Sequence, residues 1–298
     1  MPNWAYNTLT IKHNNVEVLK KIKEELKGDT EGRIFDFNKV IPMPETLDVT
    51  SPLRKDDLMF YILTLAKNRD EILELPPRIL SYIQPILDEH KTDKSLNELL
   101  KKYMQDYTKL VLAGTADKKD KHGIVKGISL LQGHHYFINI VRYGVYSWYD
   151  WCCGRWNTKW NAYCNDVELK GDTLMYQFDT AWSGPWPIAA AISALYEGTI
   201  VTMNTTYEDP DGMDSVSYYE GKPTLVAQYP QIYRYNDAAY KTYDDALKAA
   251  ENDGLDEDDA WRAVGWDIDN KNPNYRDTKG WEISPSIINY AKTAKECA

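Results

Sequence analysis

Residues 148–163 read WYDWCCGRWNTKWNAY, and this stretch holds four of the ten tryptophans of the 298-residue chain together with two adjacent cysteines. Large aromatic side chains bury much area at little conformational cost. Such a cluster is therefore either the centre of a folded core or a recognition surface. The residues of the cluster leave both interpretations open, so the flanking patterns must supply the fold.

Upstream of the cluster, the chain begins with a strand followed by a helix. Residues 4–12 alternate between polar and apolar side chains, which predicts a strand. Residues 16–27 carry apolar side chains at helical spacing, with Asn15 as the expected N-cap and Gly28 as the stop. Residues 34–44 predict a second strand that leaves the sheet at two prolines.

Downstream of the cluster, the pattern of strands and helices repeats. Alternation predicts two strands joined by a Lys170-Gly171-Asp172 turn, then a helix that opens at Pro187, then a further hairpin and an edge strand. These elements are expected at residues 166–170, 173–180, 188–196, 199–207, 216–219 and 223–229. The chain thus mixes strands and helices, which is typical of an α+β protein.

Two regions differ in character from this alternation. Residues 54–112 contain three charged, apolar-periodic stretches, which predict a helical insertion. From residue 236 the chain becomes acidic, and helices are expected at 238–252, 260–264 and 285–295. We therefore expect an appended helical region at 236–298.

The composition bounds the class of protein. The formal net charge is −10, from 45 acidic and 35 basic residues, which disfavours direct nucleic-acid binding. The 22 tyrosines against five phenylalanines favour half-exposed, partner-binding surfaces. There is no apolar run of the roughly 20 residues that a membrane span requires. The four cysteines and the absence of an N-terminal signal segment predict a cytoplasmic protein with structural thiols.

Four segments in combination resemble the YubB-like family, which is carried by bacteriophages, prophages and conjugative plasmids. They are the opening MPNW, FDFNKVIPMPETL at 35–47, YDWCCGRWNTKWNAY at 149–163 and FDTAWSGPWP at 178–187. The family usually has Trp-Gly-Thr-Lys-Trp in the third segment, whereas this chain has Asn157 in place of the glycine. Asparagine tolerates a positive φ better than most residues, so the turn is expected to survive.

The resemblance implies an architecture and an origin. The implied fold is a ferredoxin-like antiparallel sheet with helices on one face, formed by residues 1–235 and interrupted by the helical insertion. The implied setting is the cytoplasm of a bacterial host. Accessory proteins of phages and plasmids often inhibit host defence, but a fold does not by itself imply a reaction.

Lys159 is the centre of the candidate binding site. Between two indoles, its ammonium could lie beside stacking faces for a base or a partner. Alternatively, Trp156 and Trp160 share one face of a helix and pack into the sheet, while Lys159 points to water or pairs with Asp150. The candidate ligand- or partner-binding residues are Trp148, Trp151, Trp156, Asn157, Thr158, Lys159, Trp160, Trp182 and Trp186.

Catalytic and metal chemistry find little support in the sequence. No catalytic residue, metal site or cofactor is predicted, because no complete hydrolytic or Cys/His signature is present. A calcium loop around Asp209, Asp211 and Asp214 has its glycine at the wrong position. A phosphate site at residues 182–186 is disfavoured because Pro185 and the following Pro187 remove two of the backbone amides that would hold the anion.

These patterns favour a binding protein over an enzyme. The leading hypothesis is a phage or mobile-element accessory protein that binds a host protein and inhibits an antiviral defence system. The alternative is a nucleotide or small-ligand binding module centred on Trp156–Trp160. Homo-oligomerisation stays open.

Overall fold

The computed structural model describes residues 3–49, 51–121, 123–207, 212–236, 238–269, 271 and 273–296. The chain divides into two compact units. The first, which we call the sheet unit, comprises Met1–Pro42 and Cys153–Ala298, and the second, the helical unit, comprises Met43–Cys152. No helix in the described part of the chain is long and apolar enough to cross a membrane.

The sheet unit is built on an antiparallel sheet with the strand order β10-β6-β5-β4-β1-β3-β2. Its strands are β1 (Trp4–Lys12), β2 (Tyr163–Lys170), β3 (Thr173–Ala181), β4 (Ile200–Tyr207), β5 (Met213–Tyr219), β6 (Lys222–Tyr229) and β10 (Asn274–Tyr275). The strand and hairpin predictions for β1 to β6 are confirmed, except that β6 is not an edge strand over its whole length, because β10 pairs with it at Ala227 and Gln228.

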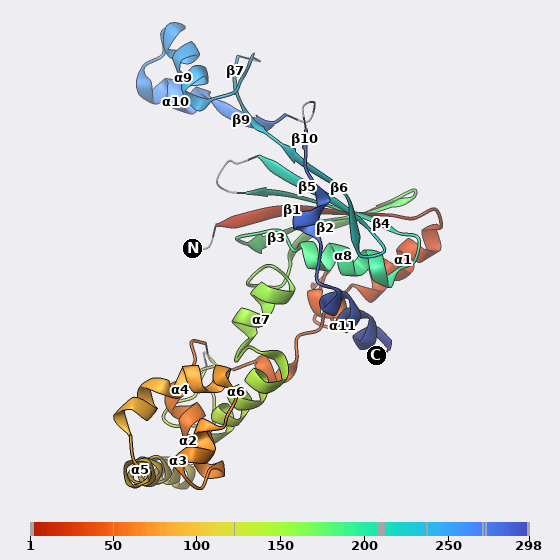
Figure 1. Ribbon diagram of the computed structural model, residues 1–298. Coiled ribbons are helices and arrows are strands. Elements are labelled where there is room, and N and C mark those ends of the chain that lie inside the picture. The colour runs from red at the N-terminus through yellow and green to blue at the C-terminus, as the bar shows by residue number, and fades with distance from the viewer. Residues whose placement is uncertain are drawn as a thin grey trace. The chain divides into compact units, whose positions relative to one another are not determined.

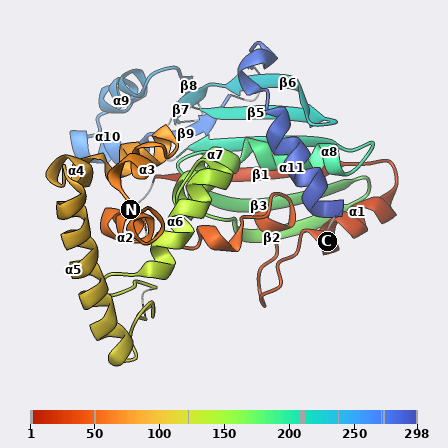
Figure 2. The same ribbon diagram turned by 60° about the horizontal axis from the view of Figure 1, so that its bottom comes forward.

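One face of this sheet is covered by helices. These are α1 (Val16–Glu25), α8 (Trp186–Leu195) and α11 (Pro285–Glu296), which Figures 1 and 2 show on the same side of the sheet. Along β1, alternate side chains from Ala5 to Ile11 are fully buried toward these helices. The other face carries mainly polar side chains, such as Thr8 and Thr10, which are half-buried. This alternation is what a sheet with one solvated face requires.

The predicted strand at residues 34–44 is wrong. The segment instead forms the short 3-10 helix η1 (Phe37–Lys39), because Asp36 caps it by accepting the Asn38 backbone N–H. The Phe37 N–H donates to the side chain of Asn161 and not to a neighbouring strand. The apolar residues of the segment serve the core, where the Phe35 ring stacks on Tyr176 with centroids 4.8 Å apart.

A second, three-stranded sheet has the order β8-β7-β9. It consists of β7 (Gln231–Tyr235), β8 (Ala238–Tyr240) and β9 (Gly265–Ile268), accompanied by α9 (Tyr243–Asn252) and α10 (Glu257–Ala263). The predicted helix at 238–252 is therefore wrong at its start. Thr242 caps α9 by accepting the Asp245 N–H, so the residues before it are left to pair as β8. The helices predicted at 260–264 and 285–295 correspond to α10 and α11.

The helical unit confirms the helical character expected for residues 54–112. Its helices are α2 (Lys55–Leu65), α3 (Arg69–Leu73), α4 (Pro77–Glu89), α5 (Asp93–Leu112), α6 (Leu130–Tyr143) and the start of α7 (Trp148–Arg155). The backbones of α2 and α6 meet at Gly133, where an added Cβ would lie 1.9 Å from the carbonyl oxygen of Asp57. Only glycine fits at so close an approach.

Buried charge lies beside this crossing. The Asp57 carboxylate is fully buried, and it accepts the Ser129 N–H and the Gln132 side-chain N–H at 3.0 Å each. Arg54 Nε lies 3.2 Å from its Oδ2 atom. Burial raises the pKa of Asp57 to about 6 despite these donors.

Candidate functional site

Trp156 and Thr158 are packing residues. The Trp156 indole is buried, meets the Phe37 ring edge-on at a centroid distance of 5.6 Å and donates Nε1–H to the carbonyl of Ile41 at 2.9 Å. The buried Thr158 hydroxyl donates to the carbonyl of Ala181 at 2.9 Å. Each polar group is satisfied inside the protein, so neither side chain is presented to a ligand.

Asn157, between them, turns the chain. Its φ is 62°, as expected for a residue that stands where the resembled family has glycine. The Asn157 Nδ2 donates to the carbonyl of Gly184 at 2.9 Å, and the Ser183 hydroxyl donates to the carbonyl of Asn157. An added Cβ at Gly184 would lie 2.3 Å from Thr205 Oγ1, so glycine is required there. The turns at 156–158 and 182–186 are thereby tied together.

A buried polar network fixes the strand ends next to these turns. Asn7 Nδ2 donates to Thr180 Oγ1 at 2.8 Å, and the Thr205 hydroxyl donates to Asn7 Oδ1 at 2.8 Å. The Thr180 hydroxyl donates onward to the carbonyl of Ser183 at 2.8 Å. The network joins β1, β3 and β4 to one another and to Ser183 of the 182–186 turn. A fully satisfied network of this kind rigidifies its surroundings.

These two turns place a lysine beside two exposed indoles. Lys159 Nζ lies 4.7 Å from the Trp160 ring centroid and 5.4 Å from that of Trp182, both within cation–π range. The Trp4 ring lies 6.2 Å from Trp160. The Trp160 side chain is 39% exposed and the Trp182 side chain is 43% exposed, whereas tryptophan is on average highly buried in folded proteins. We call Trp4, Lys159, Trp160 and Trp182 the indole–lysine cluster.

Trp182 adopts a backbone conformation that tryptophan rarely takes. Its φ is 74°, and its N–H donates to the carbonyl of Asn3 at 2.9 Å. A bulky residue with positive φ is a genuine outlier, and strain of this kind gathers at functional sites. The 182–186 turn therefore holds the exposed Trp182 indole on a strained backbone.

Exposed tyrosines extend the cluster across the solvated face of the sheet. Tyr6 on β1 and Tyr163 on β2 are both in register with Asp179 on β3, and they are 47% and 68% exposed. We call the indole–lysine cluster together with Tyr6 and Tyr163 the aromatic patch. Neither tyrosine nor Trp4 belongs to the predicted site, although Trp4 and Tyr6 share the strand face that carries polar Thr8 and Thr10.

The other predicted site residues lie elsewhere. Trp148 and Trp151 belong to the helical unit, where Trp151 is buried and Trp148 meets the Tyr149 ring at 5.8 Å. Trp186 is buried and packs edge-on against Trp281 at 4.9 Å. Of the nine predicted residues, the structure brings Lys159, Trp160 and Trp182 together at one surface. Trp156, Asn157 and Thr158 anchor the adjoining turn through their hydrogen bonds.

An anion site at the 182–186 turn finds no support in the geometry. The Trp186 N–H donates to the carbonyl of Gly184 at 3.0 Å, and the Ile188 N–H donates to that of Pro185 at 3.0 Å. These amides are therefore already used within the turn. Within the described residues, no group of three His, Cys, Asp or Glu side chains could hold a metal ion. The hypothetical calcium ligands Asp209 and Asp211 lie outside the described residues.

Among the described cysteines, Cys152 is buried, and Cys153 and Cys164 are half-buried. Burial raises the pKa of Cys164 to about 11, because desolvation disfavours the thiolate. Only the thiolate is an effective nucleophile, so Cys164 is unreactive near neutral pH.

Three comparisons with known proteins bear on the family. A crystal structure of protein Api92 from Yersinia pseudotuberculosis aligns at 11% identity over 77% of this chain and 98% of its own, with a TM-score of 0.36. A search of curated proteins finds no match. The family model described as a ferredoxin-like domain in Api92-like protein matches residues 155–243, which hold β2 to β6. The chain therefore contains a ferredoxin-like domain similar to that of Api92-like proteins, within an α+β fold.

Proposed function

We propose that this chain is a phage or mobile-element accessory protein that binds a host protein through the aromatic patch and inhibits an antiviral defence system. The observation that carries the binding role is Lys159 beside the exposed indoles of Trp160 and Trp182. Tryptophan and tyrosine dominate the residues that contribute most to protein–protein affinity. The mobile-element origin and the defence target rest on the resemblance to YubB-like proteins.

The cluster is preorganised for binding. Cation–π contacts and the two tied turns hold the rings in place, so little side-chain entropy is lost when a partner covers them. The solvated sheet face next to the rings supplies hydroxyl and amide groups, among them Thr8 and Asn204, that can form the polar rim of an interface.

The test uses three single alanine variants of exposed tryptophans. Trp160→Ala and Trp182→Ala remove rings of the cluster, whereas Trp261→Ala removes a 66% exposed indole on α10 as the matched control. Tagged full-length protein is incubated with bacterial lysate, and bound proteins are identified by mass spectrometry. We expect one specific host protein to be retained by wild type and Trp261→Ala and to be lost from both cluster variants.

The biological half of the proposal is tested by phage plating. Expression of wild-type protein in a host with an active defence system should raise plating efficiency, and Trp182→Ala should not. Equal capture by all three variants, or plating unaffected by the wild-type protein, would refute the proposal.

A nucleotide-binding role is the second candidate. The exposed indoles beside Lys159 could stack a base, although Trp156 and Thr158 of the centre predicted from sequence are buried. Titration with ribonucleotides should then quench tryptophan fluorescence in wild type and not in a Trp160→Ala, Trp182→Ala double variant. A flat response to all common nucleotides removes this candidate.

A further inference from the structure

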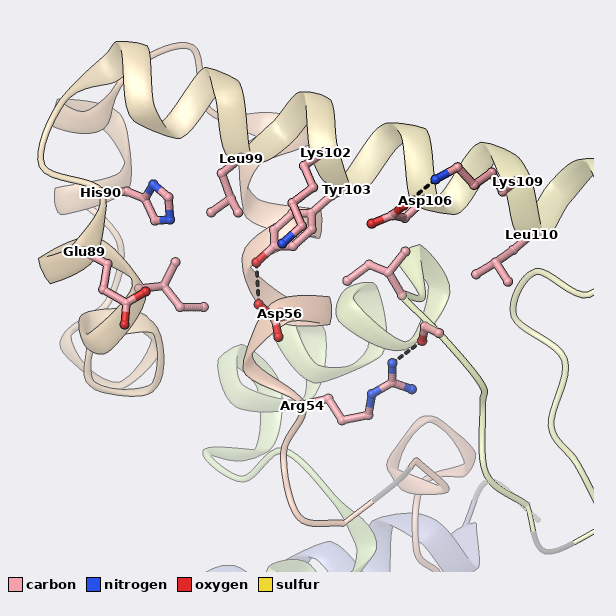
Figure 3. A pocket seen from close by; sticks show the side chains of 13 residues that line it. Arg54, Asp56, Glu89, His90, Leu99, Lys102, Tyr103, Asp106, Lys109 and Leu110 are labelled. Carbon is pink, nitrogen blue, oxygen red and sulfur yellow. Dashed lines mark hydrogen bonds and ion pairs between the residues drawn. The ribbon is translucent and has the colours of Figure 1, made fainter.

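The helical unit contains a cavity of about 590 Å³, shown in Figure 3. It lies among α2, α4, α5 and residues 127–128, and its size is typical of sites for small organic molecules. Ile86, Leu99, Leu110 and Ile128 form apolar walls. The charged side chains of the lining are Arg54, Asp56, Glu89, Lys102, Asp106 and Lys109.

Two of the three cations of the lining are already paired. Arg54 Nε lies 3.2 Å from the buried Asp57 carboxylate, and its Nη1 donates to the carbonyl of Val125 at 2.7 Å. Lys109 Nζ lies 3.0 Å from Asp106. Their charges are compensated within the protein, so neither offers a strong site for a ligand anion.

The remaining charges make the cavity negative around Tyr103. The buried Tyr103 hydroxyl donates to Asp56, and burial raises its pKa, with the charges of Asp56, Asp57 and Glu89 adding to the effect. Lys102 is the opposing cation in the lining. Two carboxylates, Asp56 and Glu89, therefore stand against one ammonium group.

We propose that this cavity binds an aliphatic polyamine, whose ammonium groups donate hydrogen bonds to the carboxylates of Asp56 and Glu89. Figure 3 shows Glu89 at the end of α4 and Asp56 on α2, with Leu99 and Tyr103 of α5 beside the space between them. A polyamine has cationic ends joined by methylene groups, which match separated carboxylates and apolar walls. Lys102 weakens this binding by like-charge repulsion.

Isothermal titration calorimetry of the full-length chain with spermidine tests the proposal. Hydrogen bonds between charged groups are strong, so Asp56→Asn and Glu89→Gln should each weaken binding about tenfold. Lys102→Met should tighten it. Glu98→Gln is the matched control, because Glu98 is an exposed carboxylate of α5 outside the lining. It should bind spermidine like wild type.

Three outcomes would overturn the proposal. They are the absence of saturable binding to wild type, an equal loss in Glu98→Gln and Glu89→Gln, or equal competition by magnesium chloride at the same concentration. Asp56→Asn also removes the carboxylate that accepts the hydrogen bond of the Tyr103 hydroxyl, so this variant could fold incorrectly. Circular dichroism distinguishes such a folding defect from a loss of spermidine binding. If Asp56→Asn is misfolded, spermidine binding by Glu89→Gln tests the proposal, because Glu89 is exposed and its substitution leaves the fold intact. The outcome is independent of host-protein capture by the aromatic patch.

Discussion

Substitution of Asn157 tests how the turn that separates Trp156 from Lys159 is built. At a φ of 62°, alanine adds backbone strain of about 1–2 kcal/mol. It also removes the 2.9 Å hydrogen bond from Nδ2 to the buried carbonyl of Gly184, which costs about 1–3 kcal/mol. We expect Asn157→Ala to lose about 2–5 kcal/mol of unfolding free energy. Asn157→Gly loses only the hydrogen-bond part, because glycine adopts this φ without strain.

Urea unfolding of both variants, followed by circular dichroism and tryptophan fluorescence, measures the difference. The variant with glycine at position 157 should be more stable than the variant with alanine by about 1–2 kcal/mol. At Asn97, an exposed position inside α5, the order should be reversed, because glycine costs about 1 kcal/mol relative to alanine in a helix. Alanine equal to or better than glycine at position 157 would refute the assigned backbone conformation.

Three further predictions concern stability. Gly184→Ala should lose about 1–3 kcal/mol of unfolding free energy in urea, since its Cβ would lie 2.3 Å from Thr205 Oγ1; an unchanged midpoint would contradict this close approach. Trp156→Phe removes a buried indole hydrogen bond and should cost about 1–3 kcal/mol, whereas Trp160→Phe should stay within about 0.5 kcal/mol in the same assay. The raised pKa of Asp57, about 6, means that the folded state binds more protons than the unfolded state between about pH 4 and 6. The contribution of Asp57 to stability is therefore present below about pH 4 and is lost as the pH rises through 6, by about 3 kcal/mol in total. The free energy of unfolding, measured across this pH range, should show that decline in wild type and not in Asp57→Asn.

The elements with a strong local pattern could be predicted from sequence. β1 and the β2–β3 hairpin alternate along their length, and α1 has its Asn15 cap where the sequence places it. Local geometry and burial point to the same structure in these segments. Such agreement makes a prediction from one sequence secure.

The wrong secondary-structure predictions at 34–44 and 238–252 share a cause. In both segments, short polar side chains compete with the regular structure that the apolar pattern favours. Asp36 closes a 3-10 turn where a strand is expected, and Thr242 caps a helix that begins at Tyr243, five residues after the predicted start. The outcome depends on distant partners, such as Asn161 for Phe37 and β7 for β8, which spacing along the chain does not reveal.

The division of the tryptophans between core and surface follows from one residue. In a helix, Trp156 and Trp160 would share a face, but α7 ends at Arg155 and the chain turns at Asn157 with positive φ. Trp156 therefore enters the core beside Phe37, while Trp160 lies at the surface beside Lys159. The partner that completes the surface, Trp182, comes from a turn 22 residues further along the chain, which Asn157 itself ties down. The same side chain thus separates the core indole from the exposed one and positions the second exposed ring, which is why the site emerges only in three dimensions.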